Sequence, residues 1–358
     1  MLHLSYEYDS PLGLRTSSAV SNSSLLLIQA ATELGIAWEI VVDTSVIEFT
    51  YLGKTQTYYF QVPSSTSALA SYACRNKRVV NTLLQRVNIT IPNGYKILRR
   101  HKEKYQLSVF RDLKKPLVVK PSNGTWGENV TVGITDEERY LEALELAFAY
   151  SSEKASSAIV EEMFYGDEYR ILLTPQKIIG IVQRVPANVV GNAIDSIHTL
   201  IKKKNAQPNR GTKGSDKSHL KIRVDKRLRQ YLSEQGLHLD YVPPKGTQIF
   251  LRKVSNISQG GDAIDVTDLA HDSVKQIAIK AIRAVPGLTF AGIDFMTKDI
   301  TKEQTADSYV IIEINDSPGF DIHDMPYIGK NRHATFEFLC LLFPELEERR
   351  SEYLALCA

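Results

Sequence analysis

The sequence predicts a fold of the α+β class that is built from more than one domain. Apolar residues with the spacing of an amphipathic helix alternate along the chain with short runs typical of strands, and turns with glycine or proline separate them. A length of 358 residues suggests about two or three domains. With 43% hydrophobic and 23% charged residues, the composition is that of a globular protein with a sizeable core.

The segment 1–75 predicts a small α/β domain. Apolar side chains share one helical face from Leu25 to Leu34, and Gly35 then ends the helix. The run Trp38–Val42 follows as a strand. Two further strands flank Gly53-Lys54, which predicts a hairpin turn between them.

A second segment combines strands with a glycine loop. A helix from Lys77 to Val87 comes first, and the strand Leu117–Lys120 then runs into a loop that holds Gly124 and Gly127. After one further helix, the strand Ala158–Glu162 closes the unit. A strand, a glycine loop, a helix and a second strand form a unit that can fold over a nucleotide.

Two more helices are predicted from their end signals. Thr135 and Glu138 predict a capping box at the start of one helix, because a threonine followed three residues later by a glutamate can satisfy the first free amides. The segment Val274–Val285 keeps the i, i+3, i+4 rhythm of apolar residues until Pro286-Gly287 ends it.

The stretch from Asn188 to about Thr247 is polar and basic. Between Lys202 and Arg229 there are eleven basic residues against two acidic ones. Such a stretch is either a solvated face or mobile loop, or a lid over phosphates, which needs the same charge. A nucleic-acid surface is disfavoured, because no aromatic residues are interleaved with this charge before Tyr231.

Charge and cysteine content exclude several classes of protein. The net charge is only +2, so the overall charge argues neither for nor against an anionic partner. Three scattered cysteines are too few for a disulfide framework or a zinc site and favour a reducing, cytoplasmic location. No signal peptide is expected. The most apolar segment, Leu25–Val42, contains charged residues, so we expect no membrane span.

Oxygen-bearing side chains near the end of the chain predict a metal site. In the run Val310–Gly319, read VIIEINDSPG, the period of a strand places Glu313 and Asn315 on one face. Asp294, on a neighbouring strand, would supply a third ligand. Hard divalent cations that carry nucleotide phosphates prefer such sparse oxygen ligands. The alternative is an ordinary strand end that leads into the turn at Ser317-Pro318-Gly319.

Other residues fit a nucleotide. Lys120 ends a strand directly before the glycine loop, so its ammonium could reach phosphate oxygens while loop amides bind the next phosphate. Glu161 and Glu168 could hold adenine and ribose hydroxyls, although two surface glutamates would give the same pattern. No GxxxxGK[ST] motif occurs in the sequence, which excludes a P-loop of the Walker type.

The ordered set of these motifs resembles the ATP-grasp superfamily. Further segments are similar to the glutathione synthetase module of the fused bifunctional glutathione enzyme and to the ATP-grasp domain of cyanophycin synthetase. The resemblance covers roughly Ser23 to Leu346. The motifs that carry it are Asn76-Lys77, the VVKP strand with its glycine loop, Val160–Arg170, Arg184–Gly191, Val242–Gly246, Leu251–Asp268, Gly292–Phe295, Ile311–Gly319 and Met325–Arg332.

The resemblance implies an ATP-grasp fold, in which two α+β subdomains grip ATP, after a small N-terminal α/β domain. It further implies an ADP-forming ligase that joins a carboxylate to an amine through an acyl phosphate. The substrates would be amino acids or short peptides, and the cofactors ATP and Mg²⁺, with two ions expected and Mn²⁺ as a substitute. A homodimer would also fit.

Several alternatives stay open at this point. The ligase could act like a glutathione synthetase, could add an amino acid to a peptide as cyanophycin synthetase does, or could build a natural-product peptide. A module that binds ATP without catalysis is the alternative of another class. Neither a nucleic acid nor a membrane is an expected partner.

Roles for single residues follow from the resemblance. It implies phosphate contacts from Lys77, Lys120 and the loop glycines Gly124 and Gly127. It implies an adenine and ribose site with further nucleotide contacts at Glu161, Glu162, Glu168 and Arg170, and magnesium ligands at Asp294, Glu313 and Asn315. Arg252 and Arg184 are candidates for stabilising the acyl phosphate, with a structural salt bridge as the alternative for Arg252. Substrate contacts are expected at Ser255, Asn256, Ser258, Gly260, Gly261, Ser317 and Gly319.

The expected domains follow the same resemblance. Residues 1–75 would form the N-terminal α/β domain, and residues 76–163 the central or lid subdomain of the ATP-grasp fold. Residues 164–358 would form its C-terminal subdomain, with the metal site and the basic loop 198–230.

Overall fold

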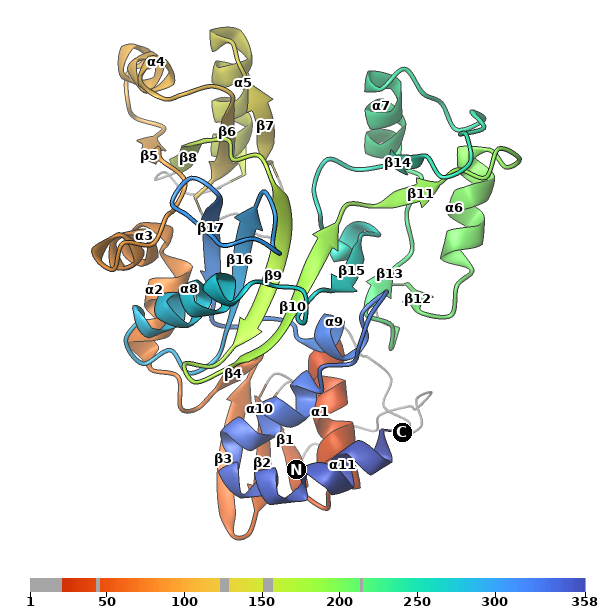
Figure 1. The fold of residues 1–358 in the computed structure, drawn as a ribbon. Coiled ribbons are helices and arrows are strands. Elements are labelled where there is room, and N and C mark those ends of the chain that lie inside the picture. Colours follow the sequence, from red (N-terminus) through yellow and green to blue (C-terminus); the bar gives the residue numbers. More distant parts are fainter. Residues whose placement is uncertain (1–20, 43–45, 123–128, 151–156, 213–214, 358) are drawn as a thin grey trace.

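A five-stranded antiparallel sheet lies at the centre of the protein (Figure 1). The computed structural model describes residues 21–42, 46–122, 129–150, 157–212 and 215–357. The strands of this central sheet are, in spatial order, β15 (Asp262–Asp265), β10 (Ile178–Val185), β9 (Asp167–Leu173), β16 (Ala291–Thr297) and β17 (Tyr309–Asn315).

Three helices bury one face of the central sheet. Apolar side chains of β9, β16 and β17 form one core with residues of these helices. The helix predicted over Val274–Val285 is present, because its apolar stripe lies against this core. The three helices are α2 (Ala68–Arg75), α3 (Lys77–Arg86) and α8 (Asp272–Arg283).

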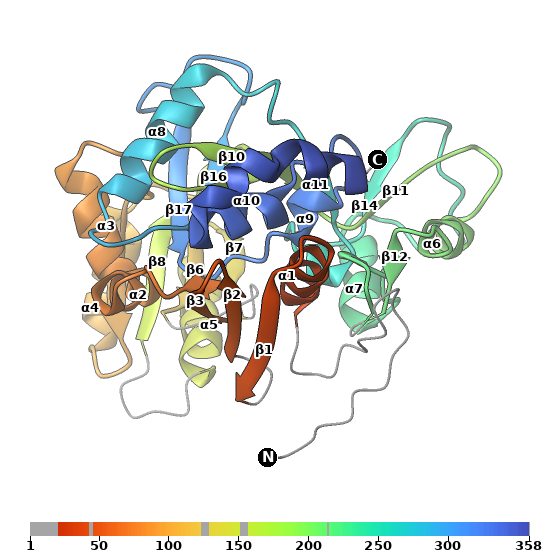
Figure 2. The ribbon, with the colours of Figure 1, turned by 90° about the horizontal axis from the view of Figure 1, so that it is seen from below.

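The N-terminal strands form a separate sheet whose core includes the C-terminal helices. Buried residues of α10 and α11 pack with those of α1 and of the strands (Figure 2). The sheet has the order β1 (Ala37–Val42), β2 (Val46–Tyr51), β3 (Lys54–Tyr59), β4 (Val62–Pro63). The helices are α1 (Asn22–Glu33), α10 (Ala334–Leu342) and α11 (Arg350–Leu356).

The predicted hairpin is confirmed, one residue earlier than expected. Tyr51 pairs with Lys54, so the turn consists of Leu52 and Gly53. Both have positive φ, 48° and 74°, which is the backbone of a two-residue hairpin turn that follows the twist of the strands. Gly53 adopts it without strain because it has no Cβ atom.

A third sheet carries the predicted strand and loop unit. Its order is β5 (Gly94–Leu98), β8 (Ser157–Glu162), β6 (Leu117–Pro121), β7 (Thr131–Ile134). The helices α4 (Glu103–Asp112) and α5 (Glu137–Ala149) share its core. The loop glycines Gly124 and Gly127 lie outside the described residues.

The capping box predicted for α5 was wrong by one position. Asp136, not Thr135, is the N-cap, and its carboxylate accepts the backbone N–H of Arg139 at 2.8 Å. Asp136 has the extended backbone that lets a short acidic side chain reach the third residue of the helix. Thr135 is one residue too early for this contact.

The basic stretch after residue 187 forms a small folded unit with its own core. In Figure 1 it stands across the central sheet from the third sheet. The helix α6 was not predicted, because it buries only Ile197, Leu200 and Ile201 and ends in three lysines. The unit contains β11 (Asn188–Val190), α6 (Ile197–Asn205), β12 (Arg210–Gly211), β13 (His219–Leu220), α7 (Lys226–Glu234) and β14 (Gln248–Phe250).

None of the helices in the described part of the chain is both long and apolar enough to cross a membrane. One short helix, α9 (Asp321–Asp324), lies between the central sheet and α1. The α+β class is confirmed by these mixed layers of helices and antiparallel sheets. The expected domain boundaries at 75/76 and 163/164 stay predictions.

Candidate active site

The predicted metal ligands lie together at the edge of the central sheet. Asp294 in β16 is the direct cross-strand partner of Glu313 in β17, and Gly292 is the partner of Asn315. Residues two apart on a strand share a face, so the three oxygen-bearing side chains lie on one face of adjacent strands. Asp294 is only 8% exposed. A buried carboxylate needs a positive partner.

Two arginines neutralise Asp294. Arg170 is its cross-strand partner in β9, and the Nε of Arg170 lies 2.8 Å from Oδ1 of Asp294. A terminal nitrogen of Arg184 lies 3.3 Å from Oδ2. The short Arg170 distance is an ion pair without hydrogen-bond alignment, so Oδ1 of Asp294 is buried without a hydrogen-bond donor among the described residues. Oδ1 of Asp294 can therefore still coordinate a cation.

The network continues from Arg184 in β10 to Glu168 in β9. Arg184 also pairs with Glu168, and the hydroxyl of Ser255 donates to the other oxygen of Glu168. Ser255 itself is buried. The structure therefore brings the predicted ribose residue, a predicted catalytic arginine and one predicted substrate residue into direct contact.

Lys77 faces these carboxylates from the start of α3. Its Nζ lies 3.8 Å from Oε2 of Glu313. Burial lowers the pKa of Lys77 most strongly, the charge of Glu313 raises it, and the charge of Lys120 lowers it again. Lys77 thus approaches the central sheet through Glu313, and it lines a cavity together with residues of β5 and β8 in the third sheet.

The predicted phosphate lysine of the third sheet is buried in an ion pair. Lys120 in β6 binds Glu161 in β8, and both side chains are under one tenth exposed. Glu162 faces the other way, where it accepts the side-chain amide of Asn93 and the backbone N–H of Lys114 at 3.0 and 3.1 Å. A bound anion would have to compete with Glu161 for the ammonium of Lys120.

The donor set suits an ion that is shared with phosphate. Among the described residues, no three His, Cys, Asp or Glu side chains gather as a ready metal cage. Asp294 and Glu313 offer carboxylates and Asn315 an amide oxygen, all of them hard ligands. Magnesium commonly takes one or two carboxylates and completes its shell with phosphate oxygens and water. The residues present fit that ion.

Arg252 is held inside the basic unit. Two of its guanidinium nitrogens donate to the carboxylate of Asp225 at 2.8 Å each, and one also donates to the carbonyl of Arg223 at 3.1 Å. The salt bridge considered as the alternative for this residue is therefore present. Its catalytic role stays a prediction.

The glycine-containing segment after Ser255 is shaped by packing. The side chain of Asn256 accepts the N–H and the hydroxyl of Ser258 at 3.0 and 2.7 Å, which holds a short turn. Gly260 has φ of 96°, and a Cβ there would lie 2.7 Å from Ile222. A Cβ on Gly261 would lie 2.7 Å from the carbonyl oxygen of Val185. These glycines permit close approach of neighbouring chain segments.

Two further predicted substrate residues lie near the N-terminal sheet. The hydroxyl of Ser317 donates to the carbonyl of Phe60. A Cβ on Gly319 would lie 3.3 Å from a carboxylate oxygen of Asp321. Their roles in substrate binding stay predictions.

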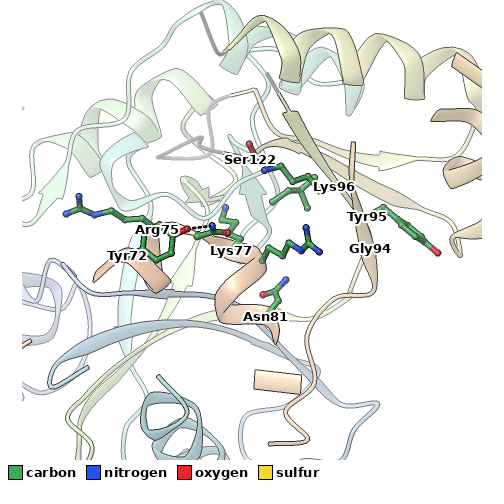
Figure 3. A pocket seen from close by; sticks show the side chains of 11 residues that line it. Tyr72, Arg75, Lys77, Asn81, Gly94, Tyr95, Lys96 and Ser122 are labelled. Carbon is green, nitrogen blue, oxygen red and sulfur yellow. Dashed lines mark hydrogen bonds between the residues drawn. The ribbon is translucent and has the colours of Figure 1, made fainter. Parts of the chain in front are cut away.

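A cavity that sequence reasoning missed opens beside Lys77 (Figure 3). Its volume is about 270 Å³. Lys96 and Arg78 line it, and neither was predicted as a site residue. The signal for Lys96 was its place next to the apolar Ile97, since alternation in a strand turns the two residues to opposite faces.

No family model matches the sequence. The chain is 35% identical over 325 residues to the glutathione biosynthesis bifunctional protein GshAB of Clostridium perfringens (strain 13 / Type A), covering 90% of this chain and 41% of that protein. It is 32% identical over 342 residues to the cyanophycin synthetase of Geminocystis herdmanii (strain PCC 6308), covering 96% of this chain and 38% of that protein. The chain thus spans about two fifths of the length of these relatives.

A solved structure agrees with these sequence matches. The crystal structure of a bifunctional glutathione synthetase from Pasteurella multocida aligns with a TM-score of 0.70 at 31% identity, covering 90% of this chain and 43% of the other. The predicted resemblance to the ATP-grasp superfamily is confirmed.

Proposed function

We propose that this protein is an ATP-dependent carboxylate–amine ligase, which forms an amide bond and releases ADP and phosphate. One observation carries the proposal. The ammonium of Lys77 lies 3.8 Å from Glu313, which is directly opposite Asp294, so a cation and two proposed oxygen ligands meet at the central sheet. The relatives named for glutathione biosynthesis and for cyanophycin support an amino acid or a short peptide as substrate.

The proposed reaction has two transfers. An oxygen of the substrate carboxylate attacks the γ-phosphorus of ATP, so that a new O–P bond forms, the bond to the β-phosphate oxygen breaks, and ADP leaves with the electron pair. The amine then attacks the acyl carbon, the C–O bond to phosphate breaks, and the amine loses a proton. No side-chain nucleophile is needed, so the protein acts by positioning and by charge neutralisation.

The side chains divide this work between the two sheets. Lys77 and Lys120 would neutralise phosphate oxygens from opposite sides. Asp294, Glu313 and Asn315 would hold Mg²⁺, with Mn²⁺ as a substitute and two ions expected, and the metal would supply charge neutralisation at the phosphates. Arg184 would stabilise the charge that develops on the transferred phosphoryl group.

The remaining predicted residues have supporting roles in this proposal. Glu161 and Glu162 would border the adenine, and Glu168 would bind the ribose hydroxyls. Arg170 would hold Asp294 in place. Arg252 and the segment Ser255–Gly261 would lie close to the reacting carboxylate. Three cysteines without a disulfide agree with a cytoplasmic location.

The proposal is tested by product analysis. The purified protein would be incubated with ATP, Mg²⁺ and pools of amino acids, γ-glutamyl dipeptides and acidic peptides, while ADP and phosphate are measured and products are identified by mass. We expect ADP, phosphate and a new amide in equal amounts for one pool. Glycine addition to a γ-glutamyl dipeptide would indicate a glutathione-like reaction, and aspartate addition to an acidic peptide a cyanophycin-like one. ATP binding without ADP release in every pool would indicate a module that is not catalytic.

A further inference from the structure

The cavity beside Lys77 has several basic residues in its lining. Helices α2 and α3 form one wall, and β5, β8 and Ser122, which directly follows β6, supply the other (Figure 3). Among the described residues that line it, four are basic and none is Asp or Glu. The lining residues are Tyr72, Arg75, Asn76, Lys77, Arg78, Asn81, Gly94, Tyr95, Lys96, Ser122 and Ile159.

Lys96 is aligned with the phosphate lysine of the proposed active site. Ile159 in the middle strand β8 is the direct partner of both Lys96 in β5 and Lys120 in β6. Side chains at paired positions share a face, so Lys96 and Lys120 extend from the same side of the sheet. Lys120 is neutralised by Glu161. Lys96 is exposed and has no ion pair within the described part of the chain.

The start of α3 adds positive charge to the same space. This helix of ten residues begins with Lys77 and Arg78, has no acidic residue in its first turn, and lacks a side-chain cap from Asn76. The amides at a helix start carry a partial positive charge that favours an anion. The side-chain amide of Asn76 instead points to the hydroxyl of Tyr72, at 3.5 Å.

The cavity connects to the proposed active site through one residue. Lys77 lines the cavity and also reaches Glu313, and its side chain is only 16% exposed. Figure 3 shows Lys77 and Lys96 extending toward the same space from α3 and β5, while Arg75 extends away from them. Arg78 and Lys96 are exposed. The cations thus form a path from the buried Lys77 to the solvent.

We propose that this cavity binds a phosphate oxyanion at a position separate from the triphosphate of ATP. A volume of about 270 Å³ is small beside the roughly 300–1,000 Å³ of sites for larger ligands, which favours a compact anion. Two sources share this chemistry, namely inorganic phosphate and the terminal phosphate of a second nucleotide such as ADP. The role of the cavity in the reaction rests on the proposed function. In that reaction, the phosphate released beside Lys77 would leave through the cavity.

The test uses the whole protein with the triphosphate site filled. The protein would be saturated with Mg²⁺ and a non-hydrolysable ATP analogue and titrated with inorganic phosphate at constant ionic strength, with binding followed by calorimetry. We expect binding that weakens about tenfold in Lys96→Gln and in Arg78→Gln, because each loses one charged hydrogen-bond donor. Lys245→Gln, which changes an exposed lysine of the basic unit, is the matched control and should bind as the parent protein does.

Each outcome decides the proposal. Phosphate binding that disappears when the analogue is added would place the anion in the triphosphate site and overturn the proposal. Equal affinity in the parent and in a Lys96→Gln, Arg78→Gln double variant with an unchanged melting temperature would also overturn it. Competition by ADP would identify a second nucleotide as the source, and its absence would identify free phosphate. Because binding is measured without turnover, the cavity can be refuted while the ligase proposal stands, and the reverse also holds.

Discussion

Two charged regions meet at Lys77 and differ in how their charges are paired. On the central sheet, the carboxylate of Asp294 is bound by Arg170 and Arg184, and Arg184 also holds Glu168. In the neighbouring cavity, no acidic residue is among the described residues that line it. The first region is a closed network of opposite charges, and the second is a set of cations.

The difference follows from burial. An ionised group that leaves water must be paired, because its desolvation costs several kcal/mol. Asp294 is 8% exposed and satisfies this rule through its arginines. Apart from Lys77, the cations of the cavity are exposed, so water hydrates Arg75, Arg78 and Lys96 until an anion arrives. Paired charges therefore preorganise the site for chemistry, whereas unpaired cations are suited to reversible binding.

The largest effect is expected from breaking the paired region at its metal ligand. Glu313→Gln should lower kcat about a thousandfold, since it removes a preorganised charge that acts on the transferred phosphoryl group. The fold and some nucleotide binding should persist, because Glu313 lies at a partly exposed strand end. Steady-state release of ADP measures the effect, with the exposed Glu303→Gln as control. Retained turnover would remove the metal assignment.

The second effect is on stability. Arg170→Met should lower the free energy of unfolding by about 3 kcal/mol, because it leaves a buried carboxylate with one cation fewer. Because Asp294 still pairs with Arg184, the loss of stability should lie at the lower end of the range that is typical for breaking a buried ion pair. Urea unfolding gives the measurement. Arg111→Met, which breaks an exposed pair with Glu137, should change little. Equal losses of stability in both variants would contradict the proposed difference between buried and exposed ion pairs.

A buried histidine beneath the paired region should make stability depend on pH. Burial, and then the charge of Arg170, lowers the pKa of His323 to about 3, whereas the unfolded chain has the ordinary value of 6.5. Below about pH 6.5 the unfolded state binds a proton that the folded state rejects, so stability falls as pH falls towards 3. The slope from this residue should approach about 1.4 kcal/mol per pH unit.

The variant His323→Leu isolates that slope. Unfolding curves at several pH values should show a flatter acid limb than in the parent protein, while the exposed His238→Gln leaves it unchanged. Asp324 acts with the opposite sign, because burial raises its pKa to about 6 and its ionisation opposes folding as pH rises from 3.8. An acid limb equally steep in His323→Leu would show that other groups cause the loss.

The smallest effect tests Lys77 as the link between the regions. Lys77→Met should weaken both the ATP analogue and inorganic phosphate about tenfold, since it contributes one cation to each. Lys96→Gln should weaken phosphate alone. Calorimetric titration of each ligand provides the comparison. If Lys77→Met affected only one ligand, the two regions would not share this residue.

Much of the candidate site could be predicted from local pattern. The period of a strand placed Glu313 and Asn315 on one face, and the structure places Asp294 directly opposite Glu313. The arginines bound to Asp294 could not be predicted as its partners, because Arg170 and Arg184 come from strands paired only in the folded sheet. The contact between Ser255 and Glu168 joins residues 87 positions apart, which no local spacing indicates.

The sequence by itself determined several strands, the helices α1, α3, α5 and α8 and the order of motifs, because apolar periodicity and turn residues act over a few neighbours. Only the tertiary structure decided which charges are paired. Ion pairs depend on distances between strands and helices that are remote in the chain, and those distances are set by core packing. Two basic residues show the contrast. Arg252 is neutralised by the carboxylate of Asp225, whereas Lys96 lies in the cavity beside another cation, Lys77.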